Sequence, residues 1–152
     1  RDVDSLKRET HLYDEDVVEE LLEAGIHPGT IQALALVPAV QVAWAGGFVE
    51  TAEREAVLKA AHSVGIIEES ATGQLLVSWL DHKPGPELFT AWKDYVAALH
   101  TVLKPVIYRQ LRQSTIETAR RIAEAAGGFL GVYSVSVAEQ RIIHQVEEAF
   151  EP

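Results

Sequence analysis

The feature that most constrains the fold is a helix–Gly-Gly–helix pattern that occurs twice. The first copy covers residues 38–65 and the second, weaker copy covers residues 122–150. In each copy the four residues Ala-Gly-Gly-Phe, at 45–48 and 126–129, separate two stretches whose apolar residues have helical spacing. Consecutive glycines interrupt a helix, because glycine in a helix interior is unfavourable and it enters turn conformations without steric cost. We therefore predict a duplicated helical hairpin with approximate twofold packing.

Apolar stripes at helical spacing also occur outside the repeat. They cover residues 14–24, 30–45, 70–80, 86–102 and 105–126. Pro38 lacks an N–H and crowds the carbonyl group of Leu34, which predicts a kink or a break near residues 36–38. Thr30 and Ser70 are suitable N-caps, and Ser136 with Glu139 matches the capping-box pattern.

These stretches predict a fold made only of helices. Residues 132–137 alternate like a short strand, but the sequence offers this segment no strand partner, so we interpret it as an extended loop. We predict a compact all-α bundle of seven or eight helices. Residues 1–12 show no sustained period and are expected to be a loosely ordered lead-in, and residues 13–152 form a single domain.

Composition disfavours several kinds of partner. The 23 acidic and 13 basic residues give a net charge of -10, which repels nucleic acid and anionic membrane surfaces. The chain has no cysteine, so disulfides and thiolate sites are excluded. No apolar run is long enough to span a membrane, and a cytoplasmic location is the simplest expectation. The chain begins at Arg1 and has no methionine, so it could be a trimmed fragment.

The sequence contains none of the common catalytic or cofactor motifs. The six histidines form no helical metal-binding spacing, and no phosphate-binding or nucleophile motif is present. His62 and His82 flank a predicted helix and could meet in a cleft. We therefore predict no catalytic residue and no cofactor. Trp44, Trp79 and Trp92 lie on predicted core faces and could line a pocket between helices.

At the two Gly-Gly turns the sequence resembles the tellurite-resistance TerB-like family of all-helical domains. The resemblance rests on residues 42–47, on Glu53 with Arg54, and on residues 127–131. The family motif is usually Ala-Asp-Gly followed, after five further residues, by a glutamate. Here Gly46 takes the place of the aspartate, and in the second copy Gly127 does the same.

The resemblance implies a stress-associated helical domain, and in the family the acidic pair binds divalent cations. Because the aspartate is missing twice, we expect Glu53 and Glu139 to act in helix capping, and Glu50 with Glu53 remains a weaker metal candidate. The leading hypothesis is a non-enzymatic binding or scaffold module with a protein partner at the paired turns, Gly46-Gly47 and Gly127-Gly128. A cation-binding domain and an enzyme of unknown class are the alternatives, and homo-oligomerisation stays open.

Overall fold

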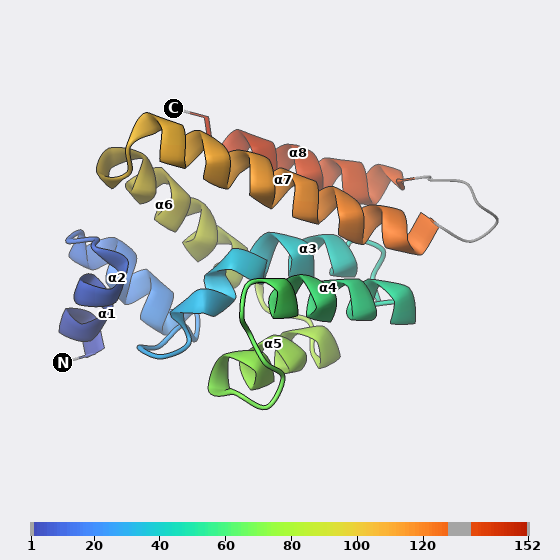
Figure 1. Ribbon diagram of the computed structural model, residues 1–152, viewed down its shortest axis with the longest axis horizontal. Helices are drawn as coiled ribbons and strands as arrows, with labels where there is room; N and C mark the ends of the chain where they lie inside the picture. Colours follow the sequence, from blue (N-terminus) through green and yellow to red (C-terminus); the bar gives the residue numbers. More distant parts are fainter. Residues whose placement is uncertain (1, 128–134, 152) are drawn as a thin grey trace.

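The computed structural model describes residues 2–127 and 135–151, and within these ranges every regular element is a helix (Figure 1). The elements are α1 (Asp2–Thr10), α2 (Glu15–Glu23), the short 3-10 helix η1 (Ile31–Leu36), α3 (Val37–Trp44), α4 (Thr51–Ser63), α5 (Ala71–Asp81), α6 (Pro86–Val102), α7 (Pro105–Gly127) and α8 (Val137–Ala149). The predicted all-α class is confirmed.

Helix α3 forms the centre of the bundle. It contacts α4, α5, α6, α7 and α8, and six of its eight residues are buried. Its only polar side chain is that of Gln41, so the helix is apolar on nearly all sides and is stable only when it is surrounded. Figure 1 shows α7 and α8 side by side along one flank of α3, with α4 and α5 on another flank and α1, α2 and α6 toward one end.

The proline at position 38 changes the type of helix, as the sequence predicts. The chain runs as a 3-10 helix from Ile31 to Leu36, and the α-helix restarts at Val37 with Pro38 in its first turn. A proline is tolerated there because the first N–H groups of a helix have no partner within it.

The predicted caps are correct at two of three positions. The Ser70 hydroxyl accepts a hydrogen bond from the Gly73 N–H at 3.0 Å, and Ser136 with Glu139 forms a capping box. Thr30 makes no cap. Its hydroxyl accepts from the His27 N–H and donates to the His27 carbonyl, so the side chain closes the preceding turn.

The expectation of a loosely ordered lead-in at residues 1–12 is wrong for the described part. Residues 2–10 form α1, whose Leu6 is fully buried, and Leu12 is buried as well. The sequence shows no period because few of these residues are apolar, yet α1 packs against α2 and η1. Ile107 lies in the predicted apolar stripe of residues 105–126, yet it is 44% exposed.

The four helices of the two predicted repeats contact one another reciprocally. Helix α3 packs on α8 and α4 packs on α7, while α3 packs on α4 and α7 on α8. A twofold arrangement of two hairpins would give this pattern. The duplication stays a prediction, because residues 128–134, which include Gly128 and the first half of the predicted extended loop, lie outside the described residues.

Candidate functional site

The starts of α4 and α8 are held by matching hydrogen bonds. At α4, the N–H of Glu50 donates to Glu53 Oε1 at 3.0 Å. At α8, the N–H of Ser136 donates to Glu139 Oε1 at 2.8 Å, and the N–H of Glu139 donates to Ser136 Oγ at 3.1 Å. Both glutamates are the third residue of their helix, so each satisfies a backbone donor that the helix itself cannot. The expected capping role of Glu53 and Glu139 is therefore present in the structure.

The two capping glutamates also meet each other. Their carboxyl groups are in hydrogen-bond contact, and the residues are only 4% and 6% exposed. Burial raises the pKa of Glu53 to about 7, the hydrogen bond from Glu50 opposes this rise, and the nearby Glu139 carboxylate adds to it. The sequence predicts separate capping roles for the two glutamates and does not pair one with the other. The structure makes each the other's partner.

The pair provides few ligands for a metal ion. One oxygen of each carboxyl group already accepts a backbone hydrogen bond, and Glu50 is exposed. Across residues 2–127 and 135–151, no group of three or more His, Asp or Glu side chains is placed to hold a metal ion. A calcium ion takes six to eight oxygen ligands, so Glu53 and Glu139 alone would leave most of its coordination to water.

The first Gly-Gly turn is exposed and holds one glycine in a special conformation. Gly47 has φ +96°, and its N–H donates to the Trp44 carbonyl at 2.9 Å. Gly46 has no positive φ, and Phe48 is 62% exposed. Of the second turn, Gly127 is the last residue of α7 and Gly128 lies outside the described residues. The structure therefore describes the first turn in full but only the start of the second, and the pairing of the two turns stays a prediction.

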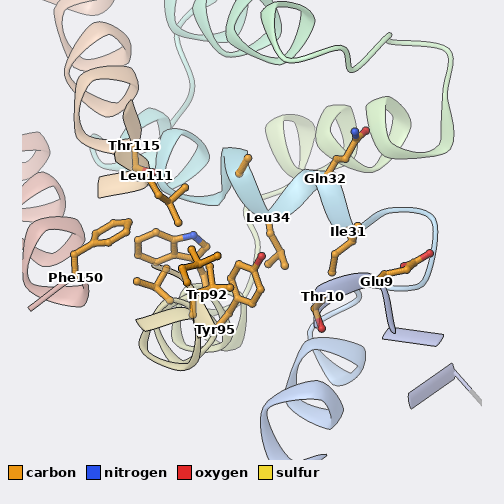
Figure 2. A pocket seen from close by; sticks show the side chains of 14 residues that line it. Glu9, Thr10, Ile31, Gln32, Leu34, Trp92, Tyr95, Leu111, Thr115 and Phe150 are labelled. Carbon is orange, nitrogen blue, oxygen red and sulfur yellow. The ribbon is translucent and has the colours of Figure 1, made fainter. Parts of the chain in front are cut away.

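An apolar cavity of about 380 Å³ lies beside α6, on the side of η1, α7 and the end of α8 (Figure 2). Its apolar walls come from Ile31, Leu34, Ala35, Trp92, Val96, Leu99, Leu103, Leu111 and Phe150. Its polar lining comes from Glu9, Thr10, Gln32, Tyr95 and Thr115. The volume falls within the range of small-molecule sites, which are typically 300–1,000 Å³ and mostly apolar.

Four uncharged polar side chains that line this cavity make no hydrogen bond to a described residue: Gln32, Trp92, Tyr95 and Thr115. Trp92 is 3% exposed as a residue, but no described side-chain nitrogen or oxygen is both fully buried and without a partner, so its indole N–H is accessible from the cavity. In the view of Figure 2, the indole nitrogen and the phenol oxygen are both turned toward Leu34, across the space between α6 and η1. Burial raises the pKa of Tyr95 above its ordinary value.

Aromatic packing fixes the wall that carries Trp92. Its ring stacks on Phe89 and meets the edge of Phe150, with both centroid distances at 5.8 Å. Phe150, which ends α8, also packs on Tyr108 of α7 at 5.5 Å. These contacts join α6, α7 and α8, so this wall is already formed without a ligand.

The three tryptophans do not converge on one pocket. The indole N–H of Trp44 donates to the carbonyl of Trp79 at 2.7 Å, which joins α3 to α5. Of the three, only Trp92 lines the cavity beside α6. The expectation that they could line a pocket is thus met by one residue, while the other two hold helices together.

The histidines considered for an enzyme are not brought into one site by the described cavities. His62 and His82 are both exposed, and the small hollow lined by His62, of about 170 Å³, does not include His82.

Sequence reasoning missed two features that only tertiary structure creates. One is the cavity, whose residues Trp92, Tyr95 and Leu99 all fall in the apolar stripe predicted over residues 86–102. The other is a second pair of carboxyl groups, Glu20 of α2 and Asp94 of α6. Partial burial and a hydrogen bond to Asp94 raise the pKa of Glu20 to about 7.

No protein-family model, curated protein or solved structure matches the chain. Among the described residues, no helix combines the length and apolar character needed to cross a membrane.

Proposed function

We propose that the protein is a non-enzymatic, TerB-like helical binding module that holds a small apolar molecule in the cavity beside α6. The observation that carries the proposal is the mostly apolar cavity of about 380 Å³, whose wall holds Trp92 with its N–H accessible from the cavity. Removing apolar ligand surface from water provides the driving force, and a few polar groups fix the orientation.

The construction of the walls supports this role. Most of the cavity is lined by residues of η1, α6 and α7, which are regular elements, and Phe150 is locked against Trp92 and Tyr108. A site that exists before the ligand arrives loses little conformational freedom on binding, so more of the interaction energy appears as affinity.

A neutral fluorescent probe, N-phenyl-1-naphthylamine, tests the proposal directly. We expect saturable binding of one probe per chain. Ala35 lines the cavity from the exposed side of η1, so Ala35→Phe should fill the cavity and weaken binding by about tenfold or more. The matched control is Ala97→Phe, which adds the same volume at an exposed position of α6 outside the cavity. Absence of saturable binding, or equal affinity in the two variants, would contradict the proposal.

A divalent-cation site at Glu53 and Glu139 is the second candidate, because the structure brings these two carboxyl groups together. A cation there would displace the proton that the pair holds, so binding should strengthen as the pH rises from 6 to 8. Calorimetric titration with Ca²⁺, Mg²⁺, Mn²⁺ and Zn²⁺ at both pH values checks this candidate. Binding that survives Glu53→Gln unchanged would exclude the pair as the site.

For the predicted protein partner or second copy, the first Gly-Gly turn is the surface that we propose. Phe48 exposes 62% of its surface there, and a large exposed aromatic side chain is typical of contact sites. Size-exclusion chromatography of the wild type and of Phe48→Ser shows whether a second copy of the chain binds at this turn. Self-association through the turn should disappear in the variant, and a dimer that persists would place the contact elsewhere.

A further inference from the structure

We infer that the cavity beside α6 selects neutral molecules that carry a carbonyl or ether oxygen on an apolar body. The inference rests on the proposed function and adds the chemical class of the ligand. It follows from which polar groups line the cavity and from which charges are missing there.

Of the four unpartnered, uncharged polar side chains at the cavity, Trp92 and Tyr95 both lie on α6 and present donors to the cavity. An indole N–H can donate a hydrogen bond but cannot accept one. Trp92 as a whole residue is 3% exposed. The N–H itself is accessible from the cavity, since no described side-chain donor is both fully buried and unpartnered, so a ligand that supplies an acceptor takes the place of water at this donor while it buries its own apolar surface. Tyr95 lies three residues further along α6, and its hydroxyl is the second donor.

The charges around the cavity exclude an anionic head group. No lysine, arginine or histidine lines the cavity, and the one carboxylate in its lining belongs to Glu9. A buried anion without a cationic partner pays a large desolvation cost, and here it would also meet Glu9 in a chain of net charge -10. A neutral oxygen acceptor satisfies the two donors without this cost.

Three probes of equal chain length separate these possibilities: 2-nonanone, nonane and nonanoate, each measured by displacement of N-phenyl-1-naphthylamine. We expect 2-nonanone to bind about 2- to 10-fold more tightly than nonane, which corresponds to one net hydrogen bond, and nonanoate to bind most weakly. Trp92→Phe and Tyr95→Phe keep an aromatic ring but remove a donor. At least one of them should lower the affinity for 2-nonanone toward that for nonane and leave nonane unchanged.

The control is Tyr108→Phe, which removes a hydroxyl that already donates to the Val96 carbonyl and does not line the cavity. It should leave the preference for the ketone intact. Equal affinities for 2-nonanone and nonane, tightest binding of nonanoate, or a ketone preference that survives both donor variants would each overturn the inference while the binding function stands. If neither the naphthylamine probe nor any of the three molecules binds, the proposed function fails and the inference falls with it.

Discussion

Glu53 and Glu139 stand 86 positions apart in the sequence, and their carboxyl groups touch between the starts of α4 and α8. Each carboxyl group also receives a backbone hydrogen bond from its own N-cap residue. The contact between the two carboxyl groups therefore joins two capping boxes. The pKa of Glu53 is raised to about 7, so near neutral pH this contact depends on whether the Glu53 carboxyl group is protonated.

The Glu53–Glu139 pair predicts that the free energy of unfolding falls as the pH rises. The Glu53 carboxyl group binds its proton more tightly in the folded chain, with a pKa of about 7 against an ordinary value of 4.5. The folded state thus carries more protons between these values, so the free energy of unfolding decreases as the pH rises from about 4.5 through 7 and then levels off. The contribution is roughly 1–3 kcal/mol. Guanidinium chloride melts at pH 5, 6, 7 and 8 measure it.

Glu53→Gln assigns the pH dependence to this carboxyl group. The glutamine oxygen can still accept the hydrogen bond from Glu50, and its amide can donate to Glu139. We expect the variant to be as stable as the wild type at pH 5 and more stable at pH 8. Glu55→Gln, at an exposed position of the same helix, should leave the slope unchanged. Some slope should remain from Glu20 beside Asp94, but a slope identical to that of the wild type would refute the role of Glu53.

The two glycines of the first turn should differ in their tolerance of a side chain. A Cβ atom at either Gly46 or Gly47 would meet nothing within 4 Å, so steric contact does not distinguish them. Only Gly47 has a positive φ, at +96°. Gly47→Ala should therefore cost about 1–3 kcal/mol of unfolding free energy through backbone strain, and Gly46→Ala should cost much less. Equal costs in denaturant melts would mean that the turn rearranges.

Two variants of Trp44 separate its hydrogen bond from its packing. Trp44→Phe keeps a ring but removes the donor to the Trp79 carbonyl, and this loss should cost about 1–3 kcal/mol. Trp44→Ala also removes most of the packing and should cost about 3–5 kcal/mol. Thermal and denaturant unfolding give both numbers, and a loss below about 1 kcal/mol for the alanine variant would show that the indole does not hold α3 to α5.

The capping serine of α8 should contribute measurably to stability. Ser136→Ala removes the acceptor for the N–H of Glu139 and should cost about 0.5–2 kcal/mol. Ser70→Ala at α5 should behave alike, since its hydroxyl accepts from Gly73. The control is Ser78→Ala, at an exposed position within α5. If Ser78→Ala is as costly as the two cap variants, capping is not the cause.

Much of the helical structure was predictable from local chemistry. The restart of the helix at Pro38, the caps at Ser70 and Ser136, and the turn at Gly46-Gly47 each depend on residues close together in the chain, so the sequence alone identifies them. The first helix was missed because Asp2–Thr10 has few apolar residues, and its stability comes from the burial of Leu6 against other elements.

The candidate sites were only partly predictable. The sequence singled out Glu53, Glu139 and Trp92 as residues of interest, because of their positions relative to the caps and the apolar stripes. It could not pair the two glutamates or distinguish a wall of a cavity from a filled core, since both depend on how separate helices meet. Local hydrogen bonding and apolar spacing determine which segments become helices. Packing among α1, η1, α6, α7 and α8 decides where a donor such as the Trp92 N–H is left without a partner, because that depends on the space between elements far apart in the chain.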